Sequence, residues 1–246
     1  MKRPLLSTAL VLGGAIGLFL FFNTLQGCRP NTSQASAVKG DAAAKTYVKP
    51  GSYDEFYNFV SGGFSGQLSV YGLPSGRMLR NIPVFSEDPQ SGYGFSEETK
   101  PMLMTTHGYI PWDDSHHPEL SQTEGVPDGK WCFINGNNTP RIALIDLGTF
   151  RTKSIIEIPN CAGNHSSPFT TGNSEYVVSG TRFSIPMGTD AQRDVPIESY
   201  RENFKGTVSF IHPDPESGKM SIAFQIITPG MNFDLSHAGK GPSEGW

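Results

Sequence analysis

The stretch KWCFINGNNTPRIALIDLGTFRTKSIIEI, residues 130–158, decides the fold class of this chain. Its residues 130–134, 141–146 and 153–158 are short apolar runs rich in β-formers, and the polar segment NGNN at 135–138 separates the first two. Short runs that alternate with turn residues are typical of strands joined as hairpins. We therefore predict a group of β-strands linked by tight turns here.

Similar groups flank this one. Paired runs occur at 66–71 and 78–85, and again at 206–211 and 220–227. The 28 glycines and 19 prolines also favour many short strands over long helices. The recurrence predicts an all-β chain built from successive blades of a β-propeller, with a β-sandwich as the alternative. Helix is expected only as single turns, at 54–59 and 197–203.

Charge and cysteine content exclude some classes of function. The formal net charge is −4, and no run of basic residues indicates a nucleic-acid partner. The three cysteines, Cys28, Cys132 and Cys161, form no Cys-x-x-Cys pair, which argues against a zinc ribbon and a thioredoxin-type motif. Cys132 and Cys161 either form a disulfide or, as is more usual for cysteines in apolar strands, are small buried side chains.

The N-terminal segment predicts export from the cytoplasm. Lys2 and Arg3 form a short basic start, an apolar run follows at 5–22, and Leu-Gln-Gly-Cys ends at Cys28. This layout is typical of a secretory signal peptide, and its ending resembles a bacterial lipobox, in which the cysteine becomes the lipidated first residue. An ordinary signal peptide or an uncleaved membrane anchor is the alternative.

These observations predict three parts of the chain: a lipoprotein signal peptide at 1–27, a flexible tether at 28–50 and the strand-rich domain at 51–246. The tether is expected because this segment is rich in Ser, Ala, Thr and Lys and has few apolar residues to bury. The domain is expected in the periplasm, held to a membrane through the lipid on Cys28.

Histidines mark the candidate chemistry. His116 and His117 are adjacent within DDSHHPELS at 113–121, and His165 ends the segment NCAGNH. Adjacent side chains on a regular strand point to opposite faces, so a shared metal site requires the pair to lie in a loop or at a strand end. Neutral imidazole suits copper, zinc, iron or nickel, and a carboxylate such as Asp114 can accept the second ring proton of a ligand histidine. The alternative is an exposed polar loop without a metal.

The segment DDSHHPELSQTEGVPDGKWCFINGNNTPRIALIDLGTFRTKSIIEIPNCAGNH, residues 113–165, resembles the N-terminal propeller segment of nitrous-oxide reductases. The shared pattern comprises Asp-x-His-His-Pro, a Ser-x-Thr-Glu-Gly turn, Asp-Gly-Lys, Phe-Ile-Asn, Arg-Ile-Ala, Ile-Pro-Asn and a histidine a few residues later. The resemblance extends more loosely over 51–246. The signal segment lacks a twin arginine, which resembles the second, Sec-exported branch of that family.

This resemblance implies a seven-bladed β-propeller, of which the chain is the N-terminal part, followed by a cupredoxin-like domain. It places His116, His117 and His165 on three of the seven histidines that hold a sulfide-bridged tetranuclear copper cluster. Asp114 matches the carboxylate that supports the cluster ligands. Glu119 stands where the better-known branch has a histidine that is not a ligand.

The other histidines match no ligand position, so surface positions are expected for His107, His212 and His237. The resemblance implies that the remaining cluster ligands and a binuclear copper site lie beyond Trp246, and calcium is a further candidate metal. The chain by itself is therefore expected to be inactive.

The implied reaction of the complete enzyme is the reduction of nitrous oxide to N₂ and water with two electrons and two protons. The implied partners are a periplasmic c-type cytochrome or similar electron donor and, for the full-length enzyme, a second copy in a homodimer. Two other classes of function stay open. One is a non-enzymatic periplasmic β-propeller lipoprotein that binds a partner, and the other is a mononuclear histidine-metal hydrolase.

Overall fold

The computed structural model describes residues 41–165, 168–186 and 196–230. The chain divides into two units, 1–47 and 48–246. In the first, the described residues form one short exposed helix, α2 (Ala42–Thr46). Among the described residues, no helix has the length and apolar character needed to cross a membrane.

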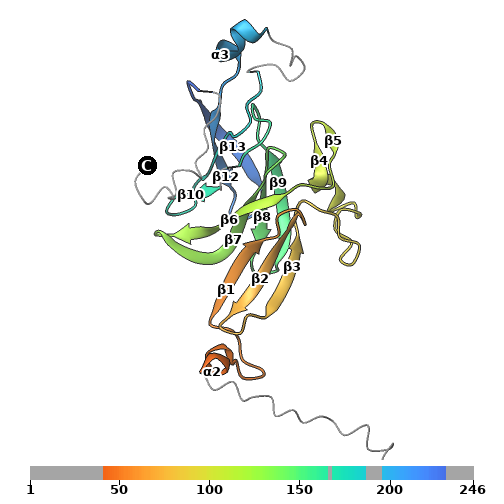
Figure 1. The fold of residues 1–246 in the computed structure, drawn as a ribbon, viewed down its shortest axis with the longest axis vertical. Coiled ribbons are helices and arrows are strands. Elements are labelled where there is room, and N and C mark those ends of the chain that lie inside the picture. The colour runs from red at the N-terminus through yellow and green to blue at the C-terminus, as the bar shows by residue number, and fades with distance from the viewer. Residues whose placement is uncertain (1–40, 166–167, 187–195, 231–246) are drawn as a thin grey trace, which may run out of the picture. The chain divides into compact units, whose positions relative to one another are not determined.

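Antiparallel strands are the main regular elements in the described part of the second unit (Figure 1). One sheet holds β1 (Phe56–Ser61), β2 (Gln67–Leu73) and β3 (Met78–Pro83). The next holds β6 (Ser115–Thr123), β7 (Val126–Gly136), β8 (Arg141–Asp146) and β9 (Arg151–Glu157). A third holds β10 (Phe169–Thr170), β11 (Val177–Gly180), β12 (Thr207–Pro213) and β13 (Met220–Ile227). In every sheet, strands that are consecutive in the chain are neighbours in space.

Shorter elements connect these sheets. They are the 3₁₀ turn η2 (Lys100–Leu103), the hairpin of β4 (Met104–Thr105) and β5 (Gly108–Tyr109), the 3₁₀ turn η3 (Ile197–Ser199) and helix α3 (Tyr200–Asn203). The last two elements together confirm the single helical turn that the sequence predicts at 197–203.

The sheet β6–β9 packs against a neighbouring sheet on each of its faces. On one face, Cys132, Ile134, Ala143 and Ile145 form a core with buried residues of β2 and β3 and the residues after them. On the other face, Phe133, Ile142 and Leu144 pack with Val177 and Ile211 of the sheet β10–β13. Side chains of a strand alternate between faces, and here both sets are apolar, as expected for a sheet covered on both sides.

The structure confirms the all-β class. A β-sandwich has two packed sheets, whereas three successive up-and-down sheets stack here with one of them in the middle. This arrangement is compatible with successive blades of a propeller, and the described residues form no closed ring. The prediction of a helical turn at 54–59 is wrong. Residues 56–61 form strand β1, because the run FYNFVS is rich in β-formers and pairs along its length with β2.

Cys132 and Cys161 are both free and buried, so they are small core side chains and not a disulfide pair. Cys132 belongs to the core on one face of the sheet β6–β9, and Cys161 belongs to the core on the other face. The sheet itself therefore separates the two sulfur atoms.

Candidate metal centre

Three histidines converge in the second unit. His116 and His117 lie at the beginning of β6, and His165 lies in the connection between β9 and β10. One ring nitrogen from each of the three lies within 4.8 Å of the other two. The ring centroids are 4.4 Å apart for His116 and His117, 4.6 Å for His116 and His165, and 5.0 Å for His117 and His165. All three side chains are half-buried.

A β-bulge explains how adjacent histidines of a strand reach the same site. Ser115 pairs with Gly136, but the next pairing joins Pro118 to Ile134, so β6 advances by one residue more than β7. Bulges of this kind bend a strand and re-aim its side chains. The expectation that the pair lies at a strand end is correct. The bulge, and not a loop, removes the alternation that would send the two imidazoles to opposite faces.

The segment that carries His165 is tied to β7 and β11 through its neighbour Asn164. The backbone carbonyl of Asn164 accepts a hydrogen bond from Asn135 Nδ2 at 2.6 Å. The Asn164 side chain is fully buried and pairs with the Ser179 hydroxyl at 3.1 Å. With its amide oxygen facing that hydroxyl, its nitrogen donates to the carbonyls of Gly136 and Thr139, each at 3.2 Å. Side-chain amides therefore help to hold this connection, together with backbone hydrogen bonds between Ala162 or Gly163 and Phe183.

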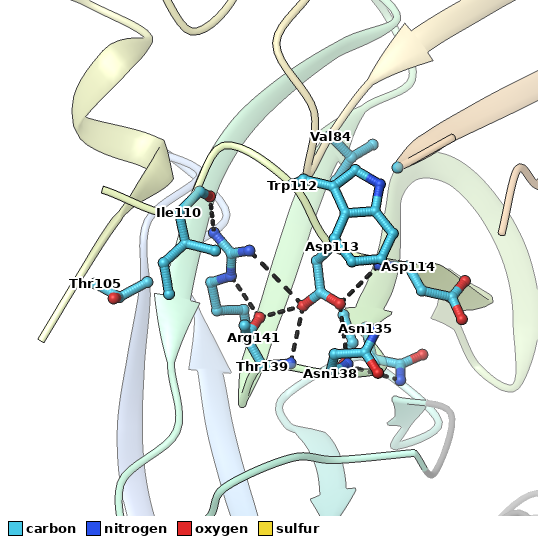
Figure 2. A network of polar contacts seen from close by, with 12 residues as sticks. Val84, Thr105, Ile110, Trp112, Asp113, Asp114, Asn135, Asn138, Thr139 and Arg141 are labelled. Atoms are coloured by element: carbon cyan, nitrogen blue, oxygen red, sulfur yellow. Dashed lines mark hydrogen bonds and ion pairs between the residues drawn. The ribbon is translucent and has the colours of Figure 1, made fainter. Parts of the chain in front are cut away.

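A second buried polar network surrounds Asp113, directly before Asp114 (Figure 2). The Asp113 carboxylate accepts backbone N–H bonds from Asp114 at 2.7 Å, Asn138 at 2.9 Å and Thr139 at 3.0 Å. It also accepts the Thr139 hydroxyl and lies 3.7 Å from an Arg141 guanidinium nitrogen. The network fixes the turn after β7 against the segment that leads into β6. No Cβ fits at Gly136, because it would overlap this carboxylate.

Arg141 completes that network from β8. Its Nε donates to the Thr139 hydroxyl at 2.7 Å, one terminal nitrogen donates to the carbonyl of Ile110 at 3.2 Å, and its guanidinium lies 5.1 Å from the centre of the Phe85 ring. Burial lowers the pKa of Arg141, and the nearby Asp113 carboxylate opposes that shift. Asp113 therefore compensates a cation in the core, a structural role that its neighbour Asp114 does not share.

Comparison with known proteins places the chain by sequence. It is 34% identical over 246 residues to the nitrous-oxide reductase of Pseudomonas fluorescens, and the alignment covers 97% of this chain. It is 31% identical over 242 residues to that of Stutzerimonas stutzeri, again over 97% of this chain. In sequence, this chain is similar to part of the nitrous-oxide reductases. It spans 36% of the length of each of these two relatives.

Other comparisons add little to this relationship. No protein-family model matches the sequence. Among solved structures, the chain is similar to the hydrazine synthase of Kuenenia stuttgartiensis with a TM-score of 0.39 and 16% identity, over 70% of this chain and 34% of that one. A TM-score of this size carries no argument about fold or function. The similarity to nitrous-oxide reductases therefore rests on sequence.

The carboxylate of Asp114, matched to the supporting carboxylate of nitrous-oxide reductases, is buried two residues before His116. Its Oδ2 accepts the Asn137 side-chain amide at 3.2 Å. Within the described part of the chain, no hydrogen bond reaches its Oδ1, although this atom is also buried. A buried carboxylate oxygen without a donor is costly, so its position suits a site where a ring proton or a bound cation lies near.

The remaining sequence-predicted residues lie apart from the three histidines or outside the described ranges. His107 and His212 are exposed, as predicted, and His212 contacts the carbonyl of Glu175 at 3.1 Å. His237 and Cys28 lie outside the described residues. A hollow of about 700 Å³ at the end of β9 is lined in part by His107 and Glu157, and none of the three converging histidines lines it.

Sequence reasoning missed three residues that organise the site: Asp113, Asn135 and Asn164. All three are fully buried. Asn135 belongs to the Phe-Ile-Asn element of the nitrous-oxide reductase pattern, and a polar side chain that ends an apolar strand run is a usable signal of a buried hydrogen-bonding role. Nothing local distinguishes Asp113 from Asp114, because only the tertiary structure shows which of the two faces Arg141.

Proposed function

We propose that His116, His117 and His165 hold copper and that this chain supplies part of the copper centre of a nitrous-oxide reductase. The observation that carries the proposal is the convergence of three imidazoles, with ligand atoms within 4.8 Å, on a bulge that overrides strand alternation. Bulges are enriched beside functional sites, and this one has a clear geometric consequence. The sequence similarity to nitrous-oxide reductases is the reason for proposing copper as the metal and nitrous-oxide reduction as the reaction.

The donor set fits copper. Imidazole nitrogen is a good ligand for copper, and it is borderline in character, so zinc, iron and nickel also accept it. A buried carboxylate near ligand histidines accepts the second ring proton, which orients the ring and raises its basicity, and Asp114 is placed in sequence for that role. When bound, a copper cluster supplies the electrons that reduce nitrous oxide to N₂ and water. The chain holds the imidazoles, orients them and partly shields them from water.

The properties of the full-length enzyme are also proposals, because the relatives are longer than this chain. We propose that the full-length enzyme has further cluster ligands, a binuclear copper site and a calcium ion, that it receives electrons from a c-type cytochrome or similar donor, and that it forms a homodimer. Export as a lipoprotein through Cys28 is also proposed, and mass spectrometry of the mature protein tests it. A lipid mass on Cys28 supports it, and an unmodified Cys28 contradicts it.

Copper binding by the 246-residue chain tests the proposal directly. Purified chain is titrated with Cu(I) against a competing chelator, and bound copper per chain is measured. We expect saturable binding that is lost when His116, His117 and His165 are all replaced by Ala. The matched control is the double variant His107→Ala, His212→Ala, which removes two exposed histidines and keeps the site. Equal copper binding by the triple variant and the wild type would overturn the proposal.

The same geometry also supports a second candidate, a mononuclear hydrolase. Three imidazoles and an open fourth position are typical of catalytic zinc sites, and here the three ligand atoms lie within 4.8 Å of one another. Zinc in place of copper, with hydrolysis of an ester substrate that depends on the three histidines, favours this candidate. A propeller that only binds a partner protein predicts that neither metal is retained.

A further inference from the structure

We infer that Asn135 is the positioning residue of the three-histidine cluster, because its single side-chain amide joins the backbone of the His117 segment to the backbone of the His165 segment. The inference rests on the proposed copper function, since it concerns how the ligands are held. It assigns to this asparagine a role in copper affinity that is distinct from ligation.

Asn135 contacts both ligand segments at once. Its Oδ1 accepts the backbone N–H of His117 at 2.8 Å, and its Nδ2 donates to the backbone carbonyl of Asn164, directly before His165, at 2.6 Å. The same nitrogen lies 3.4 Å from the carbonyl of Gly136. The side chain is fully buried in β7, directly opposite the bulge. One amide therefore spans the two segments that carry the three imidazoles.

The orientation of this amide is determined by its partners. A backbone N–H can only donate a hydrogen bond and a carbonyl oxygen can only accept one. The oxygen of Asn135 must therefore face His117 and its nitrogen must face Asn164. If the two atoms were exchanged, the amide nitrogen would face the His117 N–H and the amide oxygen would face the Asn164 carbonyl, so neither hydrogen bond could form. Of the residues similar in size, only asparagine carries a donor and an acceptor in this arrangement without charge.

The bulge creates the need for such a side chain. Between the Ser115–Gly136 and Pro118–Ile134 pairs, the ladder of β6 and β7 is interrupted, so the His117 N–H faces a side chain in place of a strand carbonyl. On its other edge, Asn135 still pairs through its backbone with Ile142 of β8, so its position is firmly set. The amide replaces the missing ladder bond of His117 and extends the connection to the next segment.

Other contacts keep the fold together when this amide is lost. The Asn164 side chain holds its segment to Ser179, and the hydroxyl of Thr170 on β10 donates to Glu119 Oε1 at 3.3 Å and to the carbonyl of Leu120 at 3.2 Å. Replacement of Asn135 is therefore expected to loosen the two ligand segments relative to each other while the sheets stay assembled.

The test compares Asn135→Leu with Thr152→Val in the 246-residue chain. Leu has the same number and branching of side-chain heavy atoms as Asn but cannot form its hydrogen bonds. Thr152 is a buried residue of β9 whose hydroxyl donates to the carbonyl of Pro83 at 2.7 Å, so its replacement also removes a buried hydrogen bond but touches no histidine. We expect Cu(I) affinity to fall about 10–100-fold in Asn135→Leu, as for other residues that support metal ligands, and to stay unchanged in Thr152→Val.

Two further measurements keep the inference testable. Hydrogen exchange of the His117 amide needs no metal and should accelerate in Asn135→Leu but not in Thr152→Val. If Asn135→Leu does not fold, Asn135→Asp takes its place. It keeps the acceptor for the His117 N–H but loses the amide donor to Asn164, so weaker copper binding is again expected.

The outcomes separate this inference from the proposed function. A folded Asn135→Leu chain with wild-type copper affinity and unchanged His117 exchange overturns the inference alone. Equal loss of affinity in Thr152→Val also overturns it, because the effect would then be one of general stability. Wild-type copper binding that survives His117→Ala overturns the proposed function, and the inference with it.

Discussion

Arg141 and Asp113 form an ion pair in which both side chains are almost completely buried, with exposed fractions of 1% and 0%. Their charged atoms lie 3.7 Å apart. Lys45 and Asp41 form a closer pair, at 2.8 Å, but their side chains are 71% and 72% exposed. By distance alone, the exposed pair would be expected to matter more for stability. Burial makes the core pair matter more, because removal of one of its partners leaves a charge that water cannot reach.

Replacement of Asp113 by Ala should therefore destabilise the domain strongly. We expect a loss of about 3–5 kcal/mol, the usual effect of removing one partner of a buried ion pair. Three backbone N–H groups, those of Asp114, Asn138 and Thr139, would lose their acceptor in addition. Urea denaturation followed by intrinsic fluorescence measures the effect. Lys45→Ala is the control and should leave the midpoint nearly unchanged. An unaltered midpoint in Asp113→Ala would contradict this assignment.

Asp114 should affect copper binding more than stability. Asp114→Asn keeps a hydrogen-bond acceptor but removes the negative charge, so a supported imidazole becomes a weaker ligand. We expect Cu(I) affinity to fall about 10–100-fold, with a smaller change than in His117→Ala. Competition titration measures both variants. Asp88→Asn is a suitable control, because Asp88 accepts the Ser91 N–H at 3.0 Å in a separate turn. The prediction fails if Asp114→Asn and Asp88→Asn bind copper equally well.

The thiols of Cys132 and Cys161 should be unreactive in the folded chain at pH 8. Burial raises the pKa of Cys161 from its ordinary value of 9.0 to about 11, and it raises the pKa of Cys132 further. Reaction with a thiol reagent, in a Cys28→Ser background, should therefore be slow in buffer and rapid for two thiols in guanidinium chloride. Fast reaction of either thiol under native conditions would show that the core opens readily.

The same shifts predict how stability changes at high pH. The pKa of the Cys161 thiol is higher in the folded chain than in the unfolded chain. Below pH 9.0, the pKa of the unfolded state, the thiol is protonated in both states and stability does not depend on its titration. As the pH rises above that value, the unfolded chain releases its protons first, so stability falls until the folded thiol also ionises near pH 11. Urea midpoints measured between these two pH values should decline, and the decline should be smaller in Cys161→Ala.

Strand β13 should promote self-association of the chain. It lies at the edge of its sheet, and Ile226 and Ile227 are 51% and 59% exposed. An apolar edge strand pairs readily with another chain, and a charge on such a strand opposes that pairing. We expect Ile227→Lys to reduce the concentration-dependent mass measured by analytical ultracentrifugation. Val126→Lys is a control for the loss of exposed apolar surface alone, since Val126 is 63% exposed and pairs with Thr123 of β6, away from β13. Equal effects of both variants would contradict a role for the edge.

Local sequence patterns determined most of the strands. The runs at 141–146 and 220–227 match β8 and β13 residue for residue, because alternation and bounding turn residues are readable within a short window. The predicted helical turn at 54–59 is wrong, because the strand character of residues 56–61 depends on their pairing with β2. Only the structure shows that Cys132 and Cys161 form no disulfide, because it places them in separate cores on the two faces of one sheet.

For the candidate metal centre, the sequence alone selected His116, His117, His165 and Asp114, because imidazole and carboxylate chemistry can be recognised from residue type and from the family pattern. Only the tertiary structure decided how the imidazoles meet. The bulge depends on the register between β6 and β7, and Asn135 joins segments that are 18 and 29 residues away from it in the chain. Hydrogen bonds over such separations leave no periodic signal in a local window, so they become visible only when the strands are paired in space.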